Sequence, residues 1–284
     1  MTVGELLSRG KTLLKNCGVE NYANEARWIF ESVFDCGREY VFLHSDDEVN
    51  EAKSREYLEK ISSRINGTPV QYIIGSWDFF GESFLVGNGV LIPRPETELL
   101  VDFALDYLAD KSEPVVFDLC AGSGCIGLSI AAHMPNARVF LIEKYPEAFN
   151  YLSKNLSRLG CSNAKAVHGD ISDGFAAFNL PKPELILSNP PYIESACLPK
   201  LQREVQREPA TALDGGESGY DFYEIISQKW LPCCGGAAAV ECGEGQADFI
   251  KSLFSHWFAE TKTLVDFNGI ERAVVGTERN KNVI

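Results

Sequence analysis

Four residues of unusual combined chemistry, Asn189, Pro190, Pro191 and Tyr192, follow an apolar run at 185–188. Because two prolines cannot continue the hydrogen bonding of a strand, we expect the chain to leave its sheet here. The Asn189 side-chain oxygen and the Pro190 carbonyl, whose conformation Pro191 narrows, can accept both N–H bonds of a planar NH₂ group. Tyr192 can stack on the same plane. A rigid turn is the simpler alternative, but the combination predicts a site for a conjugated nitrogen.

The chemistry that such a site serves is alkylation of a poor nucleophile. The lone pair of an amide or arylamine nitrogen is delocalised, so the nitrogen must be oriented toward an electrophile such as a sulfonium methyl. Orientation of this kind contributes about 7–11 kcal/mol in favourable cases. Carbonyl dipoles also stabilise the positive charge that grows on the nitrogen, so no general base need act early.

A glycine loop, DLCAGSGCIG at residues 118–127, lies between a predicted strand and a predicted helix. Gly122, Gly124 and Gly127 satisfy the G-x-G-x-x-G pattern in the context that gives the pattern meaning. Glycines let the backbone turn tightly and bring its amides close to a ligand at the helix N-terminus. The loop therefore predicts a nucleotide-type cofactor, with a purely structural turn as the alternative.

Two acidic residues near this loop bear on which cofactor binds. Glu143 ends the next predicted strand, where a carboxylate can accept both hydroxyls of a ribose. Asp118 precedes the loop, and a carboxylate there suits a cationic ligand without phosphates, such as S-adenosylmethionine. A capping role for Asp118 and a dinucleotide cofactor both stay open at this point.

The surrounding elements must place these residues together. Residues 1 to about 70 have helical spacing and predict a small domain of three to five helices, and 76–92 predict a β-hairpin linker. From residue 97 strands alternate with helices, which predicts an α/β, mostly parallel, doubly wound sheet, and Asn268-Gly269 predicts an antiparallel return at its end. Strands are expected at 114–119, 138–142, 164–168, 184–188, 237–241, 262–267 and 271–276, and helices at 97–109, 125–134, 146–159, 220–231 and 246–258.

The carboxyl ends of parallel strands lie along one edge of a sheet, which is where ligands bind in open α/β folds. Four polar residues fall at or just beyond the ends of predicted strands: Asp118, Glu143, Asp170 and Asn189. We therefore expect the glycine loop and the Asn-Pro-Pro-Tyr segment to face one common site.

Composition excludes several classes of protein. The net charge is −14 and no Lys/Arg cluster is present, which argues against binding to the phosphate backbone of a nucleic acid. The nine cysteines form no C-x-x-C pair and the four histidines lie far apart, so reduced thiols and no metal site are expected. No run approaches the roughly 20 apolar residues of a membrane helix. The first sixteen residues predict an amphipathic helix rather than a signal peptide, so a cytoplasmic protein is expected.

DLCAGSG together with SNPPYI resembles the class I S-adenosylmethionine-dependent methyltransferases that modify amino or amide nitrogens. That resemblance leaves adenine in DNA, guanine in RNA and a protein glutamine as substrates. Three further stretches, 67–105, 208–226 and 265–276, are similar to the release-factor glutamine methyltransferases, the PrmC or HemK family. The chain is thus identified as a member of that family.

The resemblance implies a Rossmann-like class I methyltransferase domain with a seven-stranded sheet and an antiparallel last strand. A helical substrate-docking domain at 1–72, a hairpin linker at 73–93 and the methyltransferase domain at 94–284 are expected. The implied reaction is methylation of the side-chain nitrogen (N5) of the glutamine in the Gly-Gly-Gln motif of peptide chain release factors. The implied partner is the release factor, with no direct binding of nucleic acid and no membrane.

The resemblance also implies roles for individual residues. The glycine loop would line the methionine part of the cofactor, Glu143 would bind the ribose, and the Asn-Pro-Pro-Tyr segment would hold the glutamine amide, with Asn189 next to the cofactor as well. Arg94 and Glu96, within the Arg-Pro-Glu-Thr signature, would support or gate the cleft, or form only a structural ion pair. The loop residues are Cys120, Ala121, Gly122, Ser123 and Gly124, and Asp170 and Ile171 would flank the adenine.

The chain departs from the usual family pattern at a few of these positions. Glu143 is one methylene longer than the more usual Asp, and Ile171 stands where an aromatic residue often covers the adenine. Cys120, Ala121 and Cys125 replace other small residues and leave room for the cofactor.

Three other functions compete with glutamine methylation. A DNA or RNA exocyclic-amine methyltransferase would use the same Asn-Pro-Pro-Tyr site but predicts a basic groove, which the acidic composition disfavours. A dinucleotide-dependent oxidoreductase explains the glycine loop but gives Asn189 to Tyr192 no function. A non-enzymatic interaction protein would make both strand-end motifs coincidences.

Overall fold

The computed structural model describes residues 1–280, so the last four residues of the expected methyltransferase domain lie outside the described part. The chain forms two compact units, each of which is described by itself. One unit comprises residues 1–76 together with 202–207, and the other comprises 77–201 together with the chain from 208 onward.

The first unit is helical, as predicted. Leu6, Phe30, Tyr57 and Ile61 are fully buried and form part of its own apolar core. The segment 202–207 belongs to this unit, where Glu204 pairs with the buried Arg64 at 2.5 Å and Arg203 donates to the carbonyl of Asn66 at 3.2 Å. Its helices are α1 (Val3–Asn16), α2 (Tyr22–Phe34), α3 (Arg38–Leu43), α4 (Glu51–Ile65) and α5 (Val70–Ile74).

The expected β-hairpin is present and consists of β1 (Ser76–Phe79) and β2 (Glu82–Leu85). Its turn is Phe80-Gly81, both with positive φ (49° and 78°), which is the geometry that matches the twist of a two-residue hairpin. Asn88-Gly89 lies beyond the hairpin and forms a separate turn.

A seven-stranded sheet forms the centre of the second unit, in the order β5-β4-β3-β6-β7-β9-β8. Neighbouring strands from β5 to β7 are parallel, and β9, the last strand of the described residues, runs antiparallel to both β7 and β8. The predicted fold class is therefore confirmed. The strands are β3 (Val115–Leu119), β4 (Arg138–Glu143), β5 (Ala164–His168), β6 (Leu185–Ser188), β7 (Ala237–Glu241), β8 (Phe258–Val265) and β9 (Glu271–Arg279).

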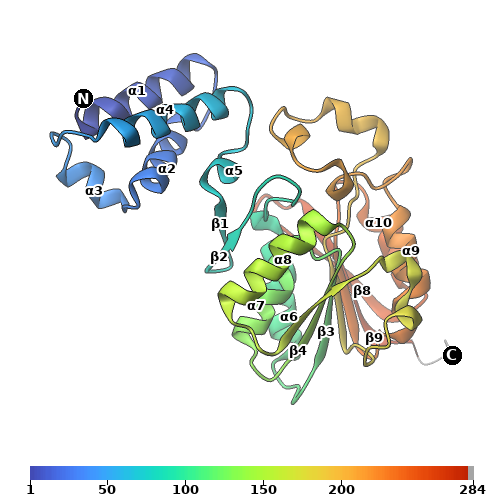
Figure 1. The fold of residues 1–284 in the computed structure, drawn as a ribbon. Helices are drawn as coiled ribbons and strands as arrows, with labels where there is room; N and C mark the ends of the chain where they lie inside the picture. The colour runs from blue at the N-terminus through green and yellow to red at the C-terminus, as the bar shows by residue number, and fades with distance from the viewer. Residues whose placement is uncertain (281–284) are drawn as a thin grey trace. The chain divides into compact units, whose positions relative to one another are not determined.

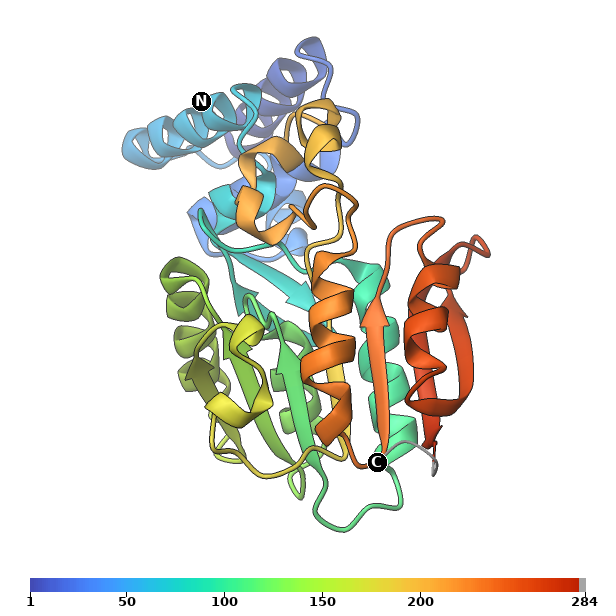
Figure 2. The ribbon, with the colours of Figure 1, turned by 90° about the vertical axis from the view of Figure 1, so that its right-hand side faces the viewer.

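Helices cover both faces of this sheet (Figure 1). Alternate residues of each central strand enter different cores, so that Val116 packs with the side chains of α6, α7 and α8, and Phe117 with those of α9 and α10. Figure 2 shows the second face, with α9 in front of the strands. The helices are α6 (Glu98–Leu108), α7 (Cys125–His133), α8 (Pro146–Leu159), α9 (Asp221–Lys229) and α10 (Ala247–Phe254), with a 3₁₀ turn, η1 (Pro95–Thr97), before α6.

Two predicted boundaries near the end of the chain are wrong, since the strand expected to begin at residue 262 begins at Phe258. The expected helix 246–258 ends at Phe254, because Phe258 begins β8 and is buried against the same core as α10. Both phenylalanines face that core with a spacing of four residues, which imitates a continuing helix in the sequence.

Candidate active site

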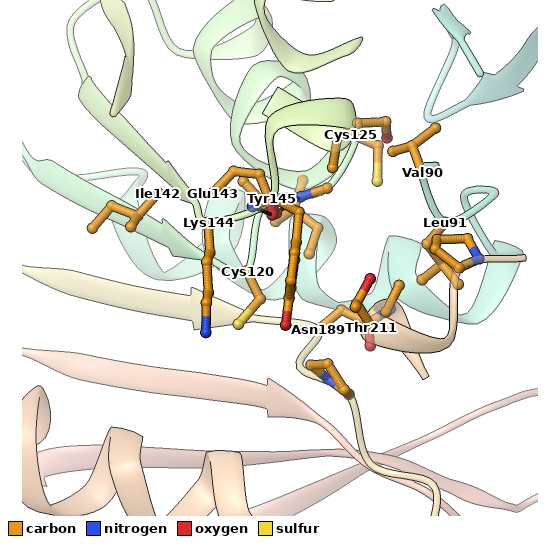
Figure 3. A pocket seen from close by; sticks show the side chains of 18 of the residues that line it. Val90, Leu91, Cys120, Cys125, Ile142, Glu143, Lys144, Tyr145, Asn189 and Thr211 are labelled. Carbon is orange, nitrogen blue, oxygen red and sulfur yellow. Dashed lines mark hydrogen bonds between the residues drawn. The ribbon is translucent and has the colours of Figure 1, made fainter. Parts of the chain in front are cut away.

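A pocket opens at the carboxyl ends of β3, β4 and β6, the edge of the sheet that the strand pattern predicted. Figure 3 shows side chains from the loop after β3, the end of β4 and the segment after β6 lining this cavity. Residues 169–171 contribute another wall, and a loop at 209–212, which sequence reasoning did not place in the site, supplies three more residues.

The glycine loop bends because three of its residues adopt positive φ: Cys120 (58°), Gly122 (56°) and Gly124 (83°). A Cβ on Gly124 would lie 2.5 Å from a methyl group of Leu152, so only glycine fits between the loop and α8. A Cβ on Gly122 would meet nothing within 4 Å, so the backbone of this residue faces open space. Cys120 to Ser123 line the pocket with Cys125, whereas Gly124 packs behind it.

Glu143 lines the pocket and is held in place by two backbone donors. Its carboxylate accepts hydrogen bonds from the backbone N–H of Gly122 and of Tyr145, each at 2.8 Å. Burial raises the pKa of this carboxyl, while the backbone donors oppose that effect. Because one carboxylate joins the glycine loop to the end of β4, it fixes the loop and keeps further lone pairs for a ligand hydroxyl.

Both cations that line the pocket within residues 1–280 already have carboxylate partners. Lys144 pairs with Asp170 at 2.7 Å, and Arg94 forms a charge-assisted bond with the buried Glu208. Asp170 also accepts from the N–H of Ser172 at 2.8 Å, and Lys144 lowers the pKa of its carboxyl against the effect of burial. A cavity with two acids and no unpaired cation suits a ligand without phosphate groups.

Asp118 lies under the pocket and is absent from its lining. Its Oδ2 accepts from the N–H of Gly127 at 2.9 Å, and its fully buried Oδ1 has no hydrogen-bond partner within residues 1–280. Burial raises the pKa of this carboxyl to about 7, the Gly127 bond lowers it, and the charge of Glu143 raises it further. The residue therefore fastens the start of α7, and a direct contact with the cofactor stays a prediction.

Asp118→Asn should make the stability of the protein less sensitive to pH. A carboxyl with a raised pKa binds its proton more tightly in the folded state, so wild-type stability falls as pH rises from the unfolded value toward the folded one. The amide does not titrate, so between pH 5 and pH 8 the free energy of unfolding should shift in the variant's favour by about 1–3 kcal/mol. Urea unfolding at both pH values measures the shift, and parallel curves for the two proteins would contradict it.

The Asn-Pro-Pro-Tyr segment reaches the pocket with two of its four side chains. Asn189 and Pro191 line the cavity, whereas Pro190 and Tyr192 lie outside the lining. The Asn189 Nδ2 donates to the Thr97 hydroxyl at 3.2 Å, and the Tyr192 hydroxyl donates to Glu241 at 3.3 Å. The predicted stacking of Tyr192 on a substrate plane stays a prediction, because its hydroxyl is directed into the protein.

The Arg-Pro-Glu-Thr signature divides between two places. Arg94 and Thr97 line the pocket, and Glu96 does not. Thr97 is buried and its hydroxyl donates to Glu241, which is also buried at the end of β7. Burial raises the pKa of Glu241 to about 7, and the two hydroxyl donors and Arg94 lower it while Glu96 raises it.

Sequence reasoning missed Glu241 and gave Thr97 no role beyond its place in the signature. It also missed Thr211, which lines the pocket from the loop at 209–212, and Tyr145, which follows the ribose-binding candidate Glu143 (Figure 3). Glu241 carried one usable signal, since it is a carboxylate at the end of a buried strand, as Glu143 is.

The described residues offer neither a metal site nor a membrane span. Among residues 1–280 no group of three or more His, Cys, Asp or Glu side chains is arranged to hold a metal ion. In the same part of the chain no helix is both long and apolar enough to cross a bilayer.

Comparison with known proteins gives two family matches. The PrmC N-terminal domain family matches residues 5–75, and the methyltransferase small domain family matches residues 97–216. The first match coincides with the helical unit, and the second spans the glycine loop, Glu143 and the Asn-Pro-Pro-Tyr segment.

Curated relatives match along almost the entire chain. The release factor glutamine methyltransferase of Geobacter sulfurreducens is 35% identical over 280 residues, which is 97% of this chain and 96% of the relative. The release factor glutamine methyltransferase of Clostridium acetobutylicum is 32% identical over 287 residues, with 97% and 98% of the two chains covered.

Solved structures support the fold. The catalytic domain of hMettl16, solved with a MAT2A 3′UTR hairpin, superposes with a TM-score of 0.57 at 15% identity, covering 82% of this chain and 84% of that one. A human methyltransferase 10 domain containing protein gives a TM-score of 0.52 at 15% identity, covering 79% of this chain and 98% of that chain. At this identity the likeness concerns the fold alone.

Proposed function

Because the chain belongs to the release factor glutamine methyltransferase family, we propose that it methylates the side-chain amide nitrogen of the glutamine in the Gly-Gly-Gln motif of peptide chain release factors. The expectation of an S-adenosylmethionine-dependent methyltransferase is confirmed by this membership. The release factor as partner, the cytoplasm as location and docking by the helical unit are parts of the same proposal.

The residues present fit the cofactor. The open backbone at Gly122, the pre-oriented Glu143 carboxylate and the ion-paired Asp170 form a cradle with acidic groups and no unpaired cation within the described lining. Glu143 would hold the ribose, Asp170 and Ile171 the adenine, and Cys120 to Ser123 the methionine part. Such a set accommodates a sulfonium better than a pyrophosphate, which argues against a dinucleotide. When bound, the cofactor supplies an electrophilic methyl group.

The residues of the chain orient the nucleophile. The Asn189 Oδ1 and the Pro190 carbonyl would accept the two N–H bonds of the glutamine amide, which fixes the plane of that amide and the direction of its nitrogen. The same oxygens face the positive charge that grows on the nitrogen during transfer, and this charge stabilisation needs no reorganisation at the moment of reaction. The proton leaves readily once the nitrogen is alkylated, so no side chain is assigned as an early base.

One observation carries this proposal. Asn189 lines the cofactor pocket with its Nδ2 engaged by Thr97, while its Oδ1 makes no hydrogen bond within residues 1–280. A side-chain oxygen that is oriented, unpaired and next to the glycine-loop pocket is what the capture of an amide N–H requires.

Transfer of label from methyl-labelled S-adenosylmethionine tests the substrate. We expect label in a release factor, no label in a release factor whose Gly-Gly-Gln glutamine is replaced by alanine, and no label in duplex DNA or structured RNA. The acidic composition, with a net charge of −14, supports the protein substrate over nucleic acid. Label in DNA or RNA but not in the release factor would establish the exocyclic-amine alternative and refute the proposal.

A further inference from the structure

Glu241 is a buried carboxylate that the reaction as described does not use. It ends β7, next to β6 in the sheet, and is 4% exposed. Its two oxygens are occupied by two hydroxyl groups, since Thr97 donates to Oε2 and Tyr192 donates to Oε1. One side chain thus binds the residue that precedes α6 and the last residue of the Asn-Pro-Pro-Tyr segment.

The hydrogen-bond directions in this cluster follow from the donors available. Above its pKa Glu241 is a carboxylate, which only accepts hydrogen bonds, and a threonine hydroxyl has a single hydrogen to give. Because Thr97 gives that hydrogen to Glu241, its oxygen can only accept from Asn189. The Asn189 amide must therefore present Nδ2 to Thr97, which leaves Oδ1 on the side away from it.

We propose that Glu241 is a positioning residue which, through Thr97, selects the Asn189 amide orientation with Oδ1 free to receive an N–H bond from the substrate nitrogen. The reversed amide would turn its NH₂ donors toward the substrate NH₂, and two donors facing each other cannot hydrogen-bond. This inference rests on the proposed function, because it specifies how the glutamine amide is captured.

The same carboxylate also restrains the segment at its other end. The Tyr192 hydroxyl is bound to Glu241, and the Tyr192 carbonyl accepts from the Gln246 side chain at 3.0 Å. Asn189 is linked to Glu241 through Thr97, and Tyr192 is bonded to Glu241 directly. Both ends of the four-residue segment are therefore held by one carboxyl group. Pre-organisation of this kind keeps the acceptor oxygens in place before the substrate arrives.

Three variants of matched shape test the link. Glu241→Gln introduces a donor beside Thr97, which permits the reversed network; Thr97→Val removes the hydroxyl; Thr97→Ser keeps it. We expect kcat on a release factor to fall about tenfold or more for the first two, at little change in cofactor affinity, and to stay within about threefold for Thr97→Ser. A kcat of Glu241→Gln within twofold of wild type would overturn the proposal.

A double-mutant cycle decides whether Glu241 acts through Thr97. In the Thr97→Val background the additional change Glu241→Gln should have almost no further effect on kcat, because the path through Thr97 is already broken and the oxygen of the new amide still accepts from the Tyr192 hydroxyl. Multiplicative losses in the double variant would mean that the residues act independently and would overturn the proposal. If Glu241→Gln does not fold, the kcat ratio of Thr97→Ser to Thr97→Val decides: tenfold supports the link and equality refutes it.

A second readout needs no substrate and no cofactor. In protein labelled with ¹⁵N-asparagine, the Asn189 side-chain NH₂ signals, assigned by their absence in Asn189→Ala, report the hydrogen bond to Thr97. We expect exchange of these protons with solvent to quicken about tenfold in Glu241→Gln and Thr97→Val relative to wild type. Unchanged exchange would overturn the proposal even if the chain methylates a different substrate, which separates this failure from failure of the proposed function.

The chain provides a control for this variant at the amino end of β6, away from the pocket. Glu184 precedes β6, and its Oε1 accepts from the Tyr107 hydroxyl at 3.0 Å, a tyrosine–carboxylate pair like that of Tyr192 and Glu241, and also pairs with Lys111 at 2.7 Å. Glu184→Gln should leave kcat and the Asn189 signals unchanged within twofold. A loss equal to that of Glu241→Gln would mean that any such change loosens the domain, and would refute a specific role for Glu241.

Discussion

Asn189→Ala should reduce methyl transfer at least about 100-fold while the protein still binds its cofactor, because the variant loses an acceptor that orients the substrate and stabilises developing charge. The cofactor cradle is built from other elements, chiefly the glycine loop and the end of β4, and these keep their own hydrogen bonds. Single-turnover rates with a release factor, together with cofactor titration by calorimetry, measure the two effects separately.

The control for this variant is Asn150→Ala, an exposed asparagine on α8 that makes no contribution to the pocket lining. Its transfer rate should equal that of wild type. Full activity of Asn189→Ala would remove the orientation mechanism, and a loss of cofactor binding as large as the loss of rate would mean that Asn189 serves the cofactor instead.

The Glu143→Gln variant should weaken cofactor binding roughly 100-fold while kcat at saturating cofactor changes only a few-fold, since hydrogen bonds to a charged group contribute about 1.5–3 kcal/mol each. The glutamine side chain has one acceptor oxygen where Glu143 has two, so it cannot serve the backbone N–H groups of both Gly122 and Tyr145. The variant therefore loses a ribose acceptor and loosens the loop together.

A matched change at Glu147, an exposed acid in the first turn of α8, controls for charge near the pocket. Glu147→Gln should bind the cofactor with wild-type affinity. If Glu143→Gln also binds normally, the carboxylate does not hold the ribose, and its function is confined to the loop.

Much of this arrangement could be predicted because the decisive residues follow strands. The hydrophobic pattern of the sequence places β3, β4, β5 and β6 correctly. Parallel pairing then brings their carboxyl ends to one edge of the sheet, independently of the conformation of the loops. The position of Asn189 beside the glycine-loop pocket follows from that rule alone. The predicted substrate class depended instead on the resemblance, because a base and a glutamine both present a planar NH₂ group.

The hydrogen-bond partners could not be predicted in the same way. Thr97 and Glu241 meet only after the sheet has formed, and no spacing or periodicity connects residues so far apart in the sequence. The partner of Arg94 could not be predicted either, since Glu208 lies in a loop without regular structure. Sequence reasoning identifies which side chains reach an edge, whereas the direction in which each side chain bonds depends on three-dimensional packing.

Methylation of the Gly-Gly-Gln glutamine is tested most directly by locating the methyl group on its substrate. A release factor is incubated with the protein and S-adenosylmethionine, digested, and sequenced by tandem mass spectrometry. We expect one added methyl group on the side chain of the Gly-Gly-Gln glutamine, absent when Asn189→Ala replaces the wild-type protein. A methyl group at any other residue, or none on the release factor under conditions where the cofactor binds, would contradict it.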